Sequence, residues 1–465
     1  MKYFLQFVFF FGINSLVSLT QQETIITGIP WYDNSGNTIS AHGAGILKDG
    51  NKYYMFGEYK SDTSNAFVGF SCYASINLTD WTFEGIVLPV QDSGRLGPQR
   101  VGERPKLMKC PSTGEYIMYM HTDNMRYKDP CVGYAMCNTI NGEYSFQGPL
   151  LFNGKPVKKW DMGIFQDTDG NGYLITHSGN LYLLSDNYKS ISRQVVEKMT
   201  PHCESPVIFK NDSLYYWIGS ELTGWERNDN YYFTATSLSG PWTSRGFIAP
   251  EGSLTWNSQS TFVLPVTGTK TTTFIYLGDR WSQPKQHSAA TYVWQPLIVD
   301  GYSVSMPEYN ESWQINTKTG EWIAKPVEGR IIKNTDKTIV YSGKWQNPSM
   351  NNELSDYRSD TIGASCALKF KGSQIGFYSI ARSDGGYARV QIKDKKGNTI
   401  HTAIVDMYCK YPENSLKFLS PKLARSTYIL TISVIGEHWY WVSKSGKKSG
   451  SLGNFVSLDK ILIMD

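Results

Sequence analysis

The chain has 465 residues, of which 18% are charged and 14% are aromatic. At ~100–200 residues per domain, this length favours two or three domains. Disordered chains are rich in charge and poor in aromatic residues, so the composition argues against an intrinsically disordered protein. The 45 basic residues nearly balance the 41 acidic ones and form no basic stripe, which argues against a nucleic-acid partner.

The first 20 residues have the form of a secretory signal peptide. Lys2 precedes an apolar run from Tyr3 to about Gly12, and a short polar stretch follows. This run is shorter than the ~20 residues that a membrane span requires, and no later stretch approaches that length. We therefore expect a secreted protein with no membrane span, and a mature chain that begins near Thr20.

Secretion changes how the sequons and cysteines are interpreted. Asn77, Asn211 and Asn310 are acceptors for glycans in a eukaryotic host. The seven cysteines show no zinc-type spacing, and their odd number leaves at least one free thiol. Cys366 and Cys409 are a candidate disulfide pair in the C-terminal region.

A turn residue followed by an aromatic, β-rich strand recurs five times, at residues 50–58, 113–121, 170–178, 211–220 and 272–280. A second phrase of strand, polar turn and aromatic residue before glycine occurs at 74–85, 137–148 and 236–246. Repeats of ~40–60 residues built only of strands and turns are typical of a β-propeller. We predict five four-stranded blades within residues 21–330, with the first phrase as a middle strand and the second as an outer hairpin.

The repeat ends near residue 330, and the polar stretch 331–338 is predicted to be a linker. From residue 339 onward, alternation such as Ala388–Ile392 marks half-buried strands, and the sequence DKKGN marks a hairpin turn. No helical periodicity interrupts this pattern. Residues 339–465 are therefore predicted to form a jelly-roll β-sandwich, and the fold class is all-β.

Each repeat places one polar side chain where the loops around a propeller mouth should begin. Glu58 ends the first strand phrase, and the other four phrases are preceded by Glu103, Asp161, Glu204 and Gln259. Glycoside cleavage needs a protonated carboxylic acid at the leaving oxygen and a second group that activates water. Carboxylates buried near one another raise each other's pKa, which keeps one protonated.

Further side chains near these positions are candidates for binding substrate. Flat apolar faces for sugar rings are offered by Trp160, Trp225, Trp256 and Trp281. His42, in SAHGAG, is either another substrate-binding residue or a core histidine whose hydrogen bonds are satisfied within the protein.

These phrases, in this order, resemble glycoside hydrolase family 43. They are AHGAGI, GERPK, WDMGIFQDTDG, CESPVIF and NSQSTFV, and the resemblance covers about residues 25–325. Members of this family are five-bladed propellers that cleave arabinosides, xylosides and galactosides. The resemblance implies that Glu204 is the general acid and that Asp161 orients it and adjusts its pKa.

The general base is where this sequence departs from most of the family. Most relatives carry a first-blade aspartate, whereas this chain has His42 and no carboxylate there. A branch resembling exo-β-1,3-galactanases shares this lack and carries the equivalents of Glu103 and Gln259. The resemblance assigns the water and the substrate to these two residues jointly. An amide is a poor base unless it passes through its imidic tautomer, so neither residue is singled out.

The expected function is an inverting exo-β-1,3-galactanase that acts on galactan polysaccharides or oligosaccharides, such as arabinogalactan side chains. Propellers of this family sometimes hold a calcium ion near the axis. This sequence has no EF-hand-like ligand loop, so we expect no required cofactor and assign no metal ligands, and the sequence leaves open whether calcium occupies the channel.

Other functions stay open from the sequence. An α-L-arabinofuranosidase or β-xylosidase would use the same scaffold, although the missing aspartate argues against it. A propeller that binds glycans without cleaving them would also lack a base. The C-terminal sandwich is either a carbohydrate-binding module or a domain whose aromatics serve packing; its candidate stacking residues are Tyr387, Trp439, Tyr440 and Trp441.

Overall fold

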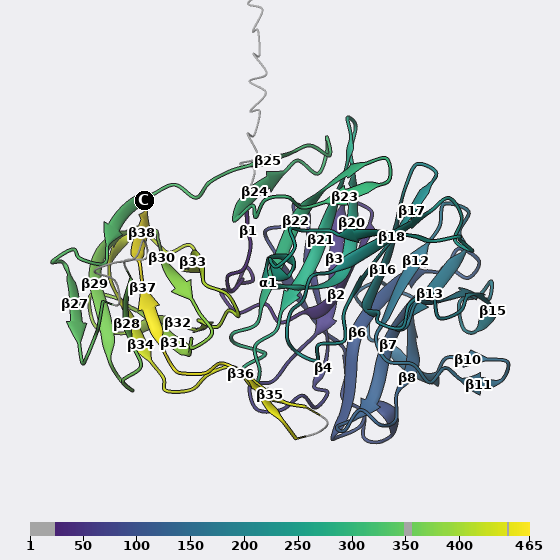
Figure 1. Cartoon of the computed structure of the whole chain (residues 1–465), viewed down its shortest axis with the longest axis horizontal. Helices are drawn as coiled ribbons and strands as arrows, with labels where there is room; N and C mark the ends of the chain where they lie inside the picture. The colour runs from purple at the N-terminus through teal and green to yellow at the C-terminus, as the bar shows by residue number, and fades with distance from the viewer. Residues whose placement is uncertain (1–23, 348–355, 444–445) are drawn as a thin grey trace, which may run out of the picture.

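The computed structural model describes residues 24–347, 356–443 and 446–465, so the signal peptide predicted at 1–20 lies outside the described residues. The described chain is almost entirely strand and turn, and it folds into two lobes (Figure 1). The first lobe is a five-bladed β-propeller and the second is a β-sandwich, which confirms the predicted fold class. None of the helices in the described part of the chain has the length and apolar character that a membrane crossing requires.

Each blade is built on four antiparallel strands that follow one another along the chain. The blades are β2 (His42–Asp49), β3 (Lys52–Glu58), β4 (Gly69–Ser75) and β5 (Thr82–Pro89); β6 (Arg100–Lys109), β7 (Tyr116–Asn124), β8 (Cys131–Cys137) and β9 (Ser145–Pro149); β12 (Met162–Gln166), β13 (Gly172–Thr176), β14 (Asn180–Leu184) and β15 (Ile191–Val196); β16 (Glu204–Asn211), β17 (Leu214–Ser220), β18 (Tyr231–Ala235) and β19 (Thr243–Phe247); and β20 (Gln259–Thr267), β21 (Thr272–Arg280), β22 (Thr291–Asp300) and β23 (Ser303–Ser305). The five repeated phrases are the second strands of these blades, as predicted.

Short elements fill the connections between the blades. The third blade is extended by β10 (Leu151–Phe152) and β11 (Lys155–Pro156), and single turns η1 (Gly94–Leu96) and α1 (Leu254–Asn257) precede the second and fifth blades. Close to the start of the described chain, β1 (Ile25–Ile26) pairs with β24 (Ser312–Ile315), which pairs with β25 (Trp322–Ala324). This small sheet ties the chain before the first blade to the chain after the last.

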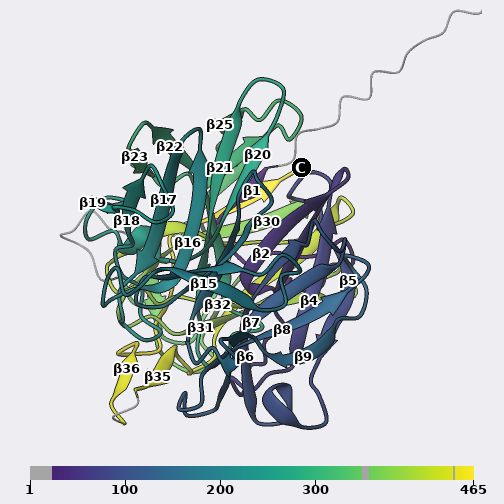
Figure 2. The same cartoon turned by 90° about the vertical axis from the view of Figure 1, so that its right-hand side faces the viewer.

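The innermost strands β2, β6, β12, β16 and β20 contact one another around a closed ring. A separate hydrophobic cluster fills the space between each pair of neighbouring blades. A middle strand is therefore buried on both faces, and β7 is buried from Tyr116 to Asp123. This two-sided burial explains why the repeated phrases are rich in aromatic and aliphatic residues instead of alternating with polar ones. Figure 2 views the molecule from the propeller side.

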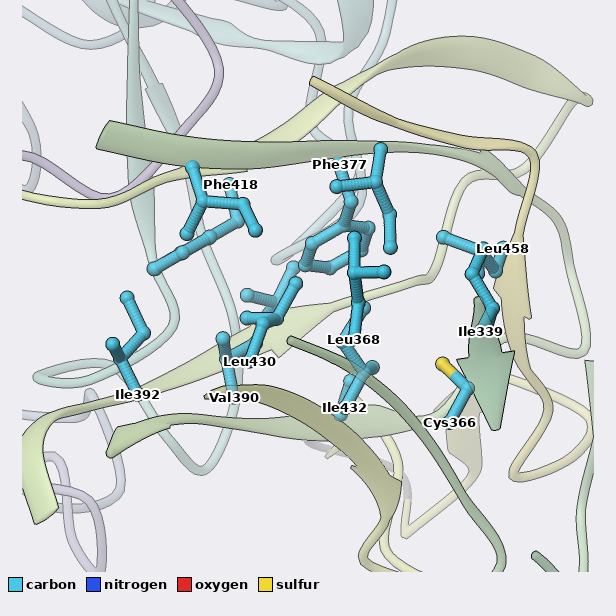
Figure 3. Close-up of a cluster of buried hydrophobic side chains, with 14 of the residues drawn as sticks. Ile339, Cys366, Leu368, Phe377, Val390, Ile392, Phe418, Leu430, Ile432 and Leu458 are labelled. Atoms are coloured by element: carbon cyan, nitrogen blue, oxygen red, sulfur yellow. The ribbon is translucent and has the colours of Figure 1, made fainter. Parts of the chain in front are cut away.

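The C-terminal domain packs two sheets face to face. One sheet contains β26 (Arg330–Lys333), β38 (Lys460–Met464), β30 (Gln374–Ala381) and β33 (Glu413–Leu419); the other contains β27 (Ile339–Ser342), β29 (Ser365–Gly372), β34 (Ser426–Val434), β31 (Tyr387–Lys393) and β32 (Thr399–Asp406). Two strand pairs complete it, β28 (Tyr357–Ser359) with β37 (Val456–Leu458) and β35 (Tyr440–Val442) with β36 (Lys448–Gly450). Along β29 buried residues alternate with more exposed ones, and Figure 3 shows Leu368 among the side chains that fill the core.

Two expectations about this region are wrong. The predicted linker 331–338 overlaps strand β26, which pairs with β38 and buries Ile332 in the sandwich core. A polar edge strand with one buried residue looks like a linker in sequence. The candidate disulfide is also absent, because Cys366 points into the sandwich core and the Cys409 thiol contacts Glu413. All seven cysteines lie in the described residues and are free thiols.

An aromatic interface joins the two domains. Tyr387 and Trp439 of the sandwich are fully buried and cluster with Tyr408 and with Trp225 of the propeller. The buried guanidinium of Arg227, from the propeller, lies 5.0 Å from the ring centre of Trp439. Tyr387 and Trp439 therefore pack between domains and cannot belong to an exposed stacking platform for sugars.

Candidate active site

A cavity of about 820 Å³ opens at the propeller mouth. Eight of the ten predicted site residues line it: Glu58, Glu103, Asp161, Glu204, Gln259, Trp160, Trp225 and Trp281. The five polar ones come from five different blades. The convergence that the repeats suggested is therefore present in the structure.

The backbone turns sharply at the predicted catalytic positions. The pairing of the first two strands shifts register directly after His42, Glu103 and Glu204 in three blades, and after Ser260, next to Gln259, in the fifth; each shift marks a β-bulge. Gly43, Arg104 and Ser205, which follow His42, Glu103 and Glu204, have positive φ values of 59°, 53° and 53°. Bulges re-aim side chains, and left-handed backbone at a non-glycine residue stores strain that the surrounding structure must support. Local geometry thus turns Glu103 and Glu204 towards the cavity.

Arg104 links the polar groups of four blades. Its Nη2 donates to Oε1 of Gln259 at 2.7 Å, and its Nε lies 3.2 Å from Oδ1 of Asp161. Its backbone N–H donates to Oε1 of Glu58 at 2.9 Å. The buried guanidinium therefore fixes Gln259 and Asp161 relative to one another, the backbone N–H of the same residue holds Glu58, and the guanidinium charge offsets that of the carboxylates. Sequence reasoning missed Arg104, although it directly follows Glu103 in GERPK.

Glu103 lies in a dense hydrogen-bond network. Its Oε1 accepts from Tyr127 Oη at 2.6 Å and from Asn65 Nδ2 at 2.9 Å, and its Oε2 lies 3.2 Å from His121 Nδ1. The other nitrogen of His121 lies 3.2 Å from Asp123. Burial alone would raise the pKa of Glu103, but the His121 hydrogen bond and the Lys60 charge hold it well below its usual range. Glu103 is therefore a fixed anion.

His121 is the cation that balances this network. Burial opposes its charge, but hydrogen bonds to Asp123 and Glu103 outweigh burial and raise the pKa of His121 to about 9. At neutral pH both ring nitrogens donate, one to each carboxylate.

Glu58 differs from Glu103 in its electrostatics. It is buried against the Lys60 ammonium, and burial together with the nearby Glu103 carboxylate raises its pKa in spite of that ammonium. Lys60 also lies 5.7 Å from the ring centre of Trp281 and 5.9 Å from that of Trp225. This part of the cavity thus combines fixed charges with aromatic faces.

Asp161 and Gln259 are positioned from both sides. Asp161 Oδ2 accepts from the backbone N–H of Ser205, next to Glu204, at 3.0 Å. Gln259 Oε1 accepts from Trp281 Nε1 at 3.0 Å as well as from Arg104, and its Nε2 donates to Ser220 Oγ at 3.1 Å. The orientation of the Gln259 amide is therefore determined by its partners.

His42 and Trp256 do not line the cavity. His42 is fully buried, lies 3.2 Å from Asp279 and stacks on Tyr292 with ring centres 4.7 Å apart, so it is a core histidine. Trp256 lies on α1, where its indole donates to Met306 O and packs between the fourth and fifth blades. The prediction that these two residues contact substrate is corrected accordingly.

In the described part of the chain, Glu103, His121 and Asp161 form the group whose potential metal-ligating atoms all lie within 4.8 Å of one another. These residues do not fit a metal ion well. Both ring nitrogens of His121 lie 3.2 Å from carboxylate oxygens, and both Glu103 oxygens already take part in hydrogen bonds. The negative charge of the group is balanced by Arg104 and His121 instead.

Comparisons with known proteins agree with this geometry. The model of the family described as "Glycosyl hydrolases family 43" matches residues 38–261. A Bifidobacterium bifidum protein, provisionally described as an exo-β-1,3-galactanase, is 37% identical, with 60% of this chain and 95% of that one covered and a TM-score of 0.57. The chain belongs to glycoside hydrolase family 43.

Two further family 43 structures extend the likeness over both domains. The exo-β-1,3-galactanase of Phanerochaete chrysosporium, solved with galactose, is 27% identical, covers 95% of this chain and 100% of its own, and has a TM-score of 0.70. That of Clostridium thermocellum is 26% identical, covers 86% and 100%, and has a TM-score of 0.59. A comparison with curated protein sequences gives no match. The protein is a glycosidase of family 43, in the exo-β-1,3-galactanase-like branch.

Proposed function

We propose that this glycosidase is a secreted, inverting exo-β-1,3-galactanase that releases galactose from β-1,3-linked galactan. The observation that carries the proposal is the shared cavity, in which Glu103, Asp161, Glu204 and Gln259 meet. His42, at the start of β2, is buried outside this cavity and stands where most relatives carry the aspartate base. The relative solved with galactose, and a glutamate-to-glutamine variant of it solved with β-1,3-galactotriose, support this substrate class.

In this proposal Glu204 protonates the leaving oxygen. Asp161 fixes the position of the acid, because it binds the backbone N–H of the residue that follows Glu204. Its negative charge also favours the protonated form of a neighbouring carboxylic acid. The oxocarbenium-like transition state gains positive charge on the sugar ring, which the fixed Glu103 and Asp161 carboxylates stabilise.

The attacking water is held by Gln259 and Glu103 together. Brønsted behaviour makes a carboxylate with a depressed pKa a weaker base, so Glu103 orients water and stabilises charge more readily than it accepts a proton. Gln259 Oε1 accepts from Trp281 and from the Arg104 guanidinium, and these two donors fix the orientation of the amide. The proton that the water loses passes to this pair of residues, and neither Glu103 nor Gln259 is singled out as its acceptor. Inversion requires the acid and base groups to lie roughly 6.5–9.5 Å apart.

The remaining expectations belong to the same proposal. The apolar N-terminal segment supports secretion, and Asn77, Asn211 and Asn310 are glycan acceptors in a eukaryotic host. The hydrogen bonds that already occupy Glu103 and His121 support catalysis without a metal. The tryptophans of the cavity supply apolar faces for the sugar rings.

Product analysis tests the proposal. The purified chain is incubated with β-1,3-galactan, arabinan and xylan, and the released sugars are separated and identified over time. We expect galactose from β-1,3-galactan alone, released from the first time point. Release of arabinose or xylose would assign the enzyme to a different activity of the family, and binding of galactan without release of sugar would make it a glycan-binding propeller.

A further inference from the structure

The C-terminal domain contributes side chains to the catalytic cavity. Its hairpin β35–β36 leaves the sandwich and reaches the propeller (Figure 1). Trp441, at the centre of β35, lines the same cavity as Glu204 and Trp225. The cavity is therefore built by both domains, and the propeller alone forms only part of its wall.

Trp441 packs on a glycine of the propeller. Gly224 has a positive φ of 66°, and a Cβ atom there would lie 2.6 Å from the Trp441 ring. No other residue type lets the indole approach the backbone this closely. The absence of a side chain at position 224 thus leaves the space that the Trp441 indole occupies.

The Trp441 indole lies on the side of the cavity that Glu204, the proposed general acid, also lines. Gly224 belongs to the loop that follows β17, and Ser220, the last residue of β17, pairs with Glu204. Leu222 and Trp225 of this loop also line the cavity, so Trp441 extends an apolar rim beside Glu204. Glu58 and Glu103, from the first and second blades, are buried carboxylates of the same cavity. A general acid faces the bond between the released sugar and the leaving group, so the apolar rim suits the leaving group.

The hairpin is anchored in place. The backbone N–H of Tyr440 donates to Gln283 O of the propeller at 3.0 Å. Trp439, next in the chain, is fully buried beneath Arg227. The indole of Trp441 is therefore held before substrate arrives, and little conformational entropy is lost when a sugar ring stacks on it.

We propose that Trp441 is a specificity-determining residue that stacks against the leaving-group side of the β-1,3-galactan chain, so that the C-terminal sandwich forms part of the catalytic site. This inference rests on the proposed function. It assigns the sandwich a role in selecting how the substrate chain enters, distinct from that of a separate binding module.

The test compares full-length wild type with Trp441→Ala, Trp441→Phe and Tyr440→Ala. Tyr440 is the matched control, since it neighbours Trp441 on the same strand and does not line the cavity. The readouts are KM and kcat for β-1,3-galactotriose, the Kd for free galactose, and the melting temperature. Loss of one apolar ring face predicts a ~10-fold rise in KM for Trp441→Ala. Galactose affinity and melting temperature should stay at wild-type values, and the Phe and Tyr440 variants should stay within about threefold.

Two results would overturn the inference: a KM that Trp441→Ala leaves unchanged, or a galactose affinity that falls by the same factor as KM rises. A Gly224→Ala chain, which displaces the indole, should reproduce the effect of Trp441→Ala. If wild type does not cleave β-1,3-galactan, the proposed function is wrong, and this result is independent of the variants. In that case calorimetric titration with β-1,3-galactotriose, arabinotriose and xylotriose decides the inference. Trp441→Ala must weaken whichever of them wild type binds, and binding of none overturns the inference.

Discussion

Replacing His121 with glutamine should remove a pH-dependent part of the free energy of unfolding. The imidazolium of His121 is buried between Glu103 and Asp123, and these partners raise its pKa from an ordinary 6.5 to about 9. Between these two values the folded protein binds a proton that the unfolded chain does not. Stability from this group is therefore fully present below pH 6.5 and is lost as the pH rises to about 9.

The size of this contribution to the free energy of unfolding follows from the same difference between the two pKa values. At ~1.4 kcal/mol for each pH unit, a rise in pKa from 6.5 to about 9 corresponds to ~3 kcal/mol. The side chain of His121 is 1% exposed, so solvent screens this interaction little. Glutamine keeps one hydrogen-bond donor but has no proton to lose in this range.

The assay is urea-induced unfolding of wild type and His121→Gln at pH 6, 7.5 and 9.5. The free energy of unfolding of wild type minus that of His121→Gln should fall by ~3 kcal/mol between pH 6 and pH 9.5. Taking the difference between the two chains at each pH cancels the titration of groups that both share. A difference that stays constant, or that grows with pH, would refute the assignment of His121 as a buried cation.

Three further predictions concern the site and the interface. Glu204→Gln should lower kcat on β-1,3-galactan by ~10²–10⁴-fold while calorimetry still detects oligosaccharide binding. Arg104→Lys should lower kcat by ~10²-fold at nearly wild-type stability, because one ammonium cannot hold both Gln259 and Asp161 as the guanidinium does; steady-state kinetics and thermal melting test this. Trp439→Ala should destabilise the domain interface by ~3–5 kcal/mol, seen as separate unfolding transitions of the two domains, whereas a single unchanged transition would contradict it.

The repeats were sufficient to predict the propeller and the cavity, for a physical reason. Blades pack face to face, so each middle strand needs apolar side chains on both faces, and this composition recurs in every blade. Equivalent positions in successive blades then lie at equivalent heights around the axis. Glu103, Asp161, Glu204 and Gln259 are recognisable from the chain because each keeps this place in its repeat.

Other parts of the site depend on contacts that sequence spacing does not encode. Arg104 meets Gln259 across 155 residues, and only closure of the blade ring brings them together. His42 and Trp256 occupy the right stretches of sequence but point into the core. The sequence shows Trp439 only as an aromatic residue near the end of the sandwich domain. Its role in the domain interface is visible only in the folded structure, where the sandwich packs against the propeller.

The anomeric form of the first released sugar tests the central claim most directly, that Glu204 and the pair of Glu103 and Gln259 act on opposite faces of one glycosidic bond. Proton NMR spectra are recorded during the first minutes of β-1,3-galactan hydrolysis, before mutarotation mixes the anomers. A single displacement by water predicts that α-galactose accumulates first and that β-galactose follows only by mutarotation. Initial release of β-galactose would contradict the account, because it requires a covalent intermediate and a nucleophile close to the acid.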